Sequence, residues 1–400
     1  MMTANDVGNA AESQPTKGHR RGPSRGMAIV GASLGVLLVA GAALVATSGT
    51  GNNGQQHASA SAHQGMVTGT VWVANEAGNS LTAIDATTNT VATTVAGIDG
   101  PHNVQVSPDG ASLWTVSGHD GYAAMLSART VDLHGAVPTG AAPAHIVVST
   151  DGATVYATNG GDETVSVIDA TTMEHIDAIK VGDGPHGLRP SPDGRWLYVA
   201  NMADSTLSVI DTQTNNPVGD IDVGQAPAQV AFSPDSRFLY ASLNGEDAVA
   251  KVDTRSRKLV GKVSVGDGPI QTYVSGDNRY LLVANQGTEK QPGTTVSVID
   301  TRTFAVIANV ETGLGAHGIV IDPSSRHAYV TNIYSDDVAI VDLTELRVVA
   351  RIPVGDKPNG ISFSTLSLEH QADVTLRLPD SAVGSHGALE GHDNPSHDGH

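Results

Sequence analysis

The stretch "YVANMADSTLSVID", Tyr198 to Asp211, returns almost unchanged as "YVTNIYSDDVAIVD", Tyr329 to Asp342. Aligning this motif along the chain gives seven copies, spaced by 42 residues except for one step of 47. The longer step contains a five-residue insertion within "QGTEKQPGTT", which follows Asn285. A fixed period of this length predicts a repeat architecture. The last position of the motif is Asp85, Ser127, Asp169, Asp211, Asp253, Asp300 and Asp342.

Each copy has the pattern of four short strands. In one copy, "HGLRP", "RWLYVAN", "STLSVID" and "NPVGDIDVG" are short apolar or alternating runs, and an "SPDG" turn separates the first two. Four antiparallel strands per repeat form a propeller blade. The first copy begins at its second strand, "TVWVAN" from Thr70, and the last ends with a first strand, "NGISFS" (359–364). We therefore predict an all-β, seven-bladed β-propeller with four-stranded antiparallel blades over residues 67–364, in which the two ends pair to complete blade one.

Two columns of the repeat have structural interpretations. One bulky residue per copy should pack against the neighbouring blade. The Asp that ends the motif should accept hydrogen bonds from backbone N–H groups of the following turn. The bulky column is Trp72, Trp114, Tyr156, Tyr198, Tyr240, Leu282 and Tyr329.

The motifs "YVAN", "TLSVID", "VGDGP" and "SPDG" resemble the YVTN-type β-propeller repeat, and the resemblance covers about Val67 to Ser364. It implies a seven-bladed propeller of the extracytoplasmic or surface-layer-like kind, related to those of nitrous oxide reductase and amine dehydrogenase. It implies no activity by itself. Nitrous oxide reductase chemistry would need a fuller histidine set and a cysteine-bearing copper domain, and this chain has no cysteine.

The first 66 residues predict export and attachment to a membrane. Residues 28–46 are uncharged and mostly apolar, and as a helix they would span about 28 Å, close to a bilayer core. Basic residues within 1–27 keep the N-terminus cytoplasmic under the positive-inside rule. We expect a transmembrane signal-anchor, with a cleaved signal peptide as the alternative, and then a flexible linker over 47–66. The propeller is extracytoplasmic in both cases, on a single-pass cell-membrane protein or, after cleavage, a secreted one.

Composition argues against several classes of function. The chain has 22 basic and 41 acidic side chains, so its formal net charge of −19 repels phosphate backbones and predicts no nucleic-acid partner. Without cysteine there are no disulfides, thiolate metal ligands or cysteine nucleophiles. The sequence has no P-loop or HExxH motif.

Antiparallel order places the loop before each first strand and the loop after each second strand on one face, at the mouth of the central channel. Histidines there can ligate copper or zinc as neutral imidazoles, or they can simply satisfy backbone groups and face solvent. Asparagines after the second strands more often hold the following loop than a ligand. The candidate ligand-binding residues are His102, His119, His145, His186, His317, Asn75, Asn159, Asn201, Asn285 and Asn332. The metal candidates among them are His102, His145 and His186.

Residues 365–400 form a C-terminal extension. Its segment "DVTLRL" alternates, which predicts one extra strand against the ring. Its end is rich in histidine and either binds transition metals loosely or serves only as a solubilising terminus. The tail imidazoles are His386, His392, His397 and His400.

Two main functions remain open at this point. The first is a membrane-tethered, extracytoplasmic propeller that binds an unknown protein or small ligand through its channel-mouth face and catalyses nothing. The alternative is a metal-dependent or redox enzyme, or an accessory subunit of one, that uses the histidines of this face. Its expected cofactor is a copper or zinc ion. Metal scavenging by the tail is a third possibility.

Overall fold

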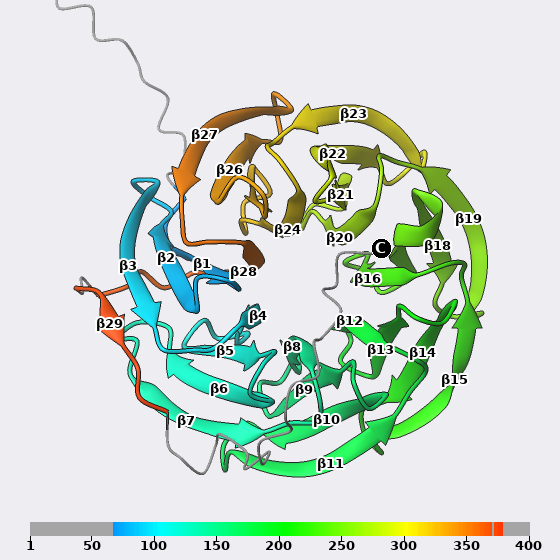
Figure 1. The fold of residues 1–400 in the computed structure, drawn as a ribbon. Coiled ribbons are helices and arrows are strands. Elements are labelled where there is room, and N and C mark those ends of the chain that lie inside the picture. Colours follow the sequence, from blue (N-terminus) through cyan, green and yellow to red (C-terminus); the bar gives the residue numbers. More distant parts are fainter. Residues whose placement is uncertain (1–66, 370–371, 379–400) are drawn as a thin grey trace, which may run out of the picture. The chain divides into compact units, whose positions relative to one another are not determined.

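The computed structural model describes residues 67–369 and 372–378. Their strands form seven antiparallel sheets that stand as blades around a central axis (Figure 1). Six sheets have four strands, and the seventh has four strands plus a short fifth one. The predicted all-β, seven-bladed propeller is therefore confirmed.

Within each blade the strands follow in order from the axis to the rim. The first strands are β28 (Pro358–Ser364), β4 (Pro101–Val106), β8 (Pro143–Val148), β12 (Pro185–Pro190), β16 (Pro227–Phe232), β20 (Pro269–Val274) and β24 (Ala316–Ile321). The second strands are β1 (Thr70–Asn75), β5 (Ser112–Ser117), β9 (Thr154–Asn159), β13 (Trp196–Asn201), β17 (Phe238–Leu243), β21 (Tyr280–Thr288) and β25 (His327–Asn332). The third strands are β2 (Ser80–Asp85), β6 (Tyr122–Ser127), β10 (Thr164–Asp169), β14 (Thr206–Asp211), β18 (Ala248–Asp253), β22 (Gln291–Asp300) and β26 (Asp337–Asp342). The fourth strands are β3 (Thr90–Ala96), β7 (Leu133–Pro138), β11 (Glu174–Lys180), β15 (Asn216–Asp222), β19 (Lys258–Ser264), β23 (Ala305–Glu311) and β27 (Arg347–Pro353).

Blade one joins the two ends of the repeat region. The last ring strand, β28, pairs antiparallel with β1, with Ser364 opposite Thr70 and Ile361 opposite Val73. On its other side β1 pairs with β2 along its whole length. The ring therefore closes as the sequence predicts, and β1 has a paired strand on both sides.

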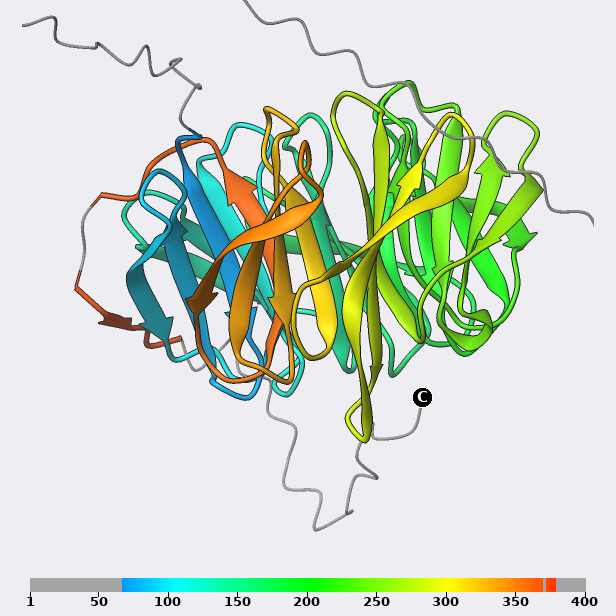
Figure 2. The same cartoon turned by 90° about the horizontal axis from the view of Figure 1, so that it is seen from above.

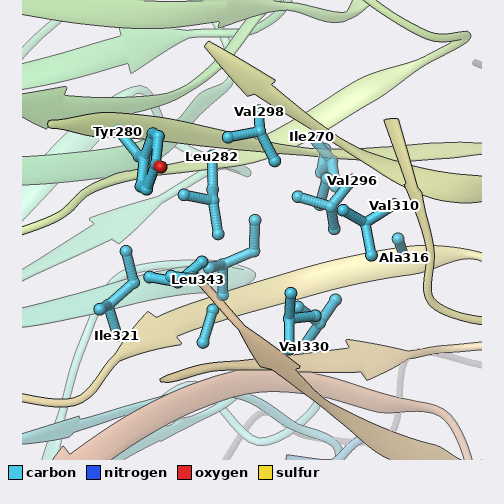
Figure 3. Packing of buried hydrophobic residues seen from close by; sticks show 14 of the residues in the cluster. Ile270, Tyr280, Leu282, Val296, Val298, Val310, Ala316, Ile321, Val330 and Leu343 are labelled. Atoms are coloured by element: carbon cyan, nitrogen blue, oxygen red, sulfur yellow. The ribbon is translucent and has the colours of Figure 1, made fainter. Parts of the chain in front are cut away.

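The hydrophobic core lies between the blades. All seven side chains of the bulky column are at most 2% exposed. Leu282 of blade six, for example, packs with Ile321, Val330 and Leu343 of blade seven (Figure 3). Each of the seven junctions has its own apolar cluster. A blade is too thin to bury an apolar face alone, so its stability depends on both neighbours.

The aspartates that end the motif cap the following turns. Asp169 Oδ1 accepts hydrogen bonds from the backbone N–H groups of Thr171 (2.9 Å) and Thr172 (2.8 Å). In blade two, Ser127 Oγ accepts the equivalent bonds from Arg129 and Thr130. The structural interpretation of this column is confirmed.

Residues 365–369 and 372–378, which we call the C-terminal strap, run across blade one. The strap includes the predicted extra strand, β29 (Val374–Thr375), which pairs in parallel with β3. Thr70 Oγ1 donates to the Leu366 carbonyl and accepts from the Leu368 N–H, both at 3.0 Å. Leucines of the strap pack against the cluster between blades one and two. They are Leu368, Leu376 and Leu378.

The predicted membrane segment, 28–46, and its flanks 1–27 and 47–66 lie outside the described residues, as do the four tail histidines. The only helix in the part of the chain that the structure describes is the 3-10 helix η1 (Asn244–Glu246). No helix there is long and apolar enough to cross a bilayer.

Ending the chain after Ser364 should destabilise the ring because it removes the strap. Three half-buried leucines contribute about 1 kcal/mol each. We expect the melting temperature to fall by roughly 6–10 °C. Thermal unfolding followed by circular dichroism would measure the shift, with a chain that ends after Leu378 as the control. Equal melting temperatures for the two truncations would contradict a stabilising role of the strap.

Candidate metal centre

The seven first strands surround the axis, and each breaks register with its second strand near its start. β4 pairs Pro101 with Ser117 but Asn103 with Val116, and the other first strands show similar shifts. Such irregularities suspend the strict alternation of strand side chains. The second and third positions of different first strands can therefore meet at the axis. We call these positions the hub layer: His102, Asn103, Ala144, His145, His186, Gly187, Ala228, Gln229, Ile270, Gln271, His317, Gly318, Asn359 and Gly360.

Three histidines of the hub layer lie together. His102 comes from blade two, His145 from blade three and His186 from blade four. One ring nitrogen of each lies within 4.8 Å of the corresponding nitrogens of the other two. The ring centroids of His145 and His186 are 4.5 Å apart, and His102 lies 5.5 Å and 5.4 Å from them. The structure thus brings together all three histidines that were predicted from the sequence as metal candidates.

Backbone carbonyls of the next blade orient two of these rings. His102 Nδ1 lies 2.9 Å from the Ala144 carbonyl oxygen, and His186 Nδ1 lies 2.9 Å from the Ala228 carbonyl oxygen. Because a carbonyl only accepts, Nδ1 carries the proton in both rings and Nε2 carries the lone pair. Metal-ligating histidines in proteins usually donate their second nitrogen in this manner, which fixes the tautomer and the ring orientation.

His145 is held differently, by a side-chain amide. Gln229 Oε1 accepts the Val230 N–H at 2.8 Å, which leaves Gln229 Nε2 to donate to His145 Nδ1 at 3.3 Å. His145 Nε2 is buried and has no hydrogen-bond partner among the described residues. For Nε2 to ligate a metal, the imidazole proton must move to Nδ1, and the Gln229 amide must turn so that its oxygen accepts that proton.

Burial keeps the deeper imidazoles neutral. His317 of blade seven lies close to the three-histidine cluster. Burial lowers the pKa of His317 to about 3, assisted by the neighbouring His102 and His186 and weakly opposed by the Asn359 carbonyl. Burial also lowers the pKa of His145 well below its usual range, and His186, His102, His317 and Arg189 lower it further. Neutral imidazole is the form that binds metal ions.

Glycines allow the first strands to approach closely around the hub layer. A Cβ atom on Gly187 would lie 2.4 Å from Gln229 Oε1, and one on Gly318 would lie 2.4 Å from the Asn359 carbonyl oxygen. No side chain fits at either position without moving the backbone or its neighbours. The hub is consequently narrow enough for histidines of different blades to contact one another.

The cluster has the donor set and nearly the dimensions of a three-coordinate metal site. A point equidistant from three nitrogens separated by 4.8 Å lies about 2.8 Å from each, whereas a Zn–N bond is about 2.0–2.1 Å long. Metal binding would therefore draw each ring inward by a few tenths of an ångström to about 0.7 Å. Three imidazoles leave a coordination position for water or another ligand.

Other candidates lie apart from this cluster. His119 is 62% exposed, and its Nδ1 lies 3.4 Å from an Asp99 carboxylate oxygen. The asparagine column is buried and holds the adjacent strand: Asn201 Nδ2 donates to Thr206 Oγ1 (2.9 Å) and Ser208 Oγ (3.0 Å). Equivalent bonds are made by Asn75, Asn159 and Asn285, while Asn332 donates to the Thr312 carbonyl and to Asp337.

The insertion lengthens the β21–β22 hairpin. Asn285 in β21 pairs with Pro269 at the start of β20, so the hairpin projects from the face onto which the hub histidines open. Figure 2 shows it extending beyond the other loops of that face. Its exposed tip, Glu289 and Lys290, thus stands beside the channel mouth.

Sequence reasoning missed Gln229 and Arg189. Gln229 was detectable, because "APAHI" (142–146) and "APAQV" (226–230) differ at His145 and Gln229, two blades apart. Arg189 lies three residues after His186 in β12 and lines the channel with Gln105, Tyr273 and Ser362. Nothing in its local sequence distinguishes it from a surface arginine.

Comparisons with known proteins agree with the architecture. The sequence matches the YNCE-like β-propeller family over residues 123–247 and 219–378. No curated protein matches the chain. Among solved structures, Kuenenia stuttgartiensis hydrazine synthase is 26% identical, with a TM-score of 0.61, over 66% of this chain and 90% of that one. Dihydro-heme d1 dehydrogenase NirN in complex with DHE is 15% identical, with a TM-score of 0.57, over 74% of this chain and 75% of that one. A putative 6-phosphogluconolactonase from Bacteroides uniformis is 17% identical, with a TM-score of 0.63, over 74% of this chain and 99% of that one. The last two similarities concern the fold alone.

The lowered pKa of His317 predicts that the propeller becomes less stable in acid. The pKa of about 3 in the folded protein lies below the ordinary histidine pKa of 6.5, so the unfolded chain binds a proton that the folded chain does not. The stability of the fold therefore falls as pH drops from 6.5 towards 3. We expect His317 to account for a loss of roughly 2–3 kcal/mol between pH 7 and pH 4.5. Urea unfolding at both pH values should show a smaller loss for His317→Gln. The control is His134→Gln, at an exposed position in β7. An unchanged pH dependence in His317→Gln would contradict the assignment.

Proposed function

The chain belongs to the YNCE-like β-propeller family, and we propose that it is a binding protein whose ligand is a transition-metal ion held by His102, His145 and His186. The observation that carries this proposal is the convergence of one nitrogen from each ring within 4.8 Å. The carbonyl-bound Nδ1 atoms of His102 and His186 support it, because they direct Nε2 lone pairs to ligation.

The chemistry of the donors selects the ion. Imidazole nitrogen suits copper, zinc, nickel and iron, whereas magnesium and calcium prefer oxygen ligands. Without a cysteine in the chain, a thiolate-rich copper or zinc site is ruled out. We therefore expect Cu(II) or Zn(II), with Cu(II) the tighter of the two under the Irving–Williams order.

The propeller works outside the cytoplasm in this proposal. The apolar run at 28–46 with its preceding basic residues would anchor the chain in the cell membrane, and the polar linker 47–66 would present the ring on the outer side. The loop face with the β21–β22 hairpin is the surface for a protein or small-ligand partner. The net charge of −19 argues against a nucleic-acid partner.

A second candidate is an accessory subunit of a redox enzyme. Its support is the 26% identity to hydrazine synthase, which covers 90% of that chain. The two functions differ in what accompanies the protein. An accessory subunit should be recovered from its native cell envelope in a fixed ratio with an enzyme subunit, whereas a metal-binding protein should be recovered with its ion and without a stoichiometric enzyme subunit.

Metal binding is tested directly by calorimetry. The protein for this titration is a chain that ends after Leu378, which lacks the tail histidines, and a chelator first removes any bound metal. We expect this metal-free chain to bind one Cu(II) or Zn(II) ion per molecule. His102→Ala and His186→Ala should each weaken binding by at least roughly 100-fold, because each removes a ligand. His119→Ala is the matched control on the same face. Absence of stoichiometric binding, or equal weakening by the control, would refute the metal site.

Gln229→Glu should strengthen metal binding. A carboxylate offers two acceptor oxygens, one for the Val230 N–H and one for a proton on His145 Nδ1, so no amide rotation is required. Carboxylate–histidine pairs of this type change metal affinity by about 10-fold or more. The same titration measures the change, and Gln271→Glu, in the equivalent position of blade six, is the control. Unchanged or weaker binding in Gln229→Glu would count against ligation by His145.

A further inference from the structure

Arg189 is a cation within the channel, three residues along β12 from His186. It lines a cavity of about 20 Å³ between the first strands. Polar neighbours on that cavity include Gln105, Tyr273 and Ser362. Arg189 is partly exposed, and the burial of its guanidinium among the surrounding strands lowers the pKa of Arg189. The group nevertheless stays protonated at neutral pH, as arginine does in proteins.

No carboxylate forms an ion pair with Arg189 among residues 67–369 and 372–378. Its contacts there are with uncharged groups. Arg189 Nη1 lies 3.4 Å from Gln105 Oε1, and the guanidinium carbon lies 5.9 Å from the centre of the Tyr273 ring. The nearby hub histidines, His102, His145, His186 and His317, cannot serve as counter-ions, because imidazole is neutral or positively charged. A chain with 19 more acidic than basic side chains thus leaves this cation without a carboxylate.

An uncompensated charge that is partly withdrawn from water weakens folding. Proteins usually relieve that cost with a counter-ion of opposite sign. We infer that the channel binds a small monoanion at Arg189. The cavity adjoins the proposed metal centre, because His145 also lines it, but Arg189 itself is not a proposed metal ligand.

The dimensions of the cavity limit the anion. A cavity of about 20 Å³ holds one or two waters, so chloride and ions of similar size, such as nitrite or formate, fit and sugar phosphates do not. An additional donor is present. Ser362 Oγ accepts hydrogen bonds from the Val106 N–H (3.0 Å) and from Gln105 Nε2 (3.5 Å), which leaves its hydroxyl proton for another acceptor. Tyr273 is another residue of the cavity wall.

Thermal unfolding of the chelator-treated full chain tests the inference. Sodium chloride, nitrite or formate would replace sodium gluconate at constant ionic strength, so that only the identity of the anion changes. We expect a saturable rise in melting temperature of about 2–4 °C with at least one small anion. The rise should vanish in Arg189→Gln and persist in Arg195→Gln, which removes an exposed arginine.

Bromide provides a second measurement that needs no variant. A crystal of the wild-type protein soaked in sodium bromide should show an anomalous peak beside the Arg189 guanidinium, about 3–4 Å from it. An equal anion response in Arg189→Gln would overturn the inference, as would the absence of both a saturable response and a bromide peak. Because the protein is free of metal in the unfolding assay, these outcomes are independent of whether the histidine cluster binds an ion.

Discussion

The pairing of β28 with β1 is the constraint on which the rest of the structure depends. Seven thin sheets share their apolar surfaces only with neighbours, so a missing contact at one junction would expose a row of large side chains such as Trp72 and Tyr329. Closure also fixes the number of blades, and the number of blades fixes the width of the hub. The chemistry of the channel therefore depends on a strand pair near the two ends of the repeat region.

A narrow hub changes the character of the side chains that line it. His102, His145 and His186, which are 41 to 84 residues apart in sequence, become neighbours. Burial holds His145 and the nearby His317 in the neutral form. A guanidinium, that of Arg189, lies farther along the same channel. The interior is thus rich in nitrogen donors and carries a positive charge, whereas the chain as a whole is acidic.

The architecture could be read from the sequence because every blade repeats the same constraints. The 42-residue period and the column of large side chains predicted the number of blades. The first strand that the first copy lacks, and that follows the last copy, predicted the closure of the ring. The histidine cluster was harder to predict, since His145 stands one position away from the column of His102 and His186. Strict strand alternation would send it to the opposite side. The register break at the start of each first strand interrupts the alternation, so His145 can face His102 and His186. Such a break has no clear sequence signal. Gln229 and Arg189 were missed because their roles come from contacts between blades, which a single repeat does not encode.

The β21–β22 hairpin distinguishes one sector of the loop face from the other six. It projects from one sector of the face onto which the histidines open, so a broad flat surface would meet Glu289 and Lys290 before it met the channel mouth. A partner of the kind proposed above would need to be small enough to enter beside the hairpin, or to have a notch that receives it. One five-residue insertion thereby breaks the sevenfold equivalence of the face and gives an otherwise symmetric disc a single preferred orientation for docking.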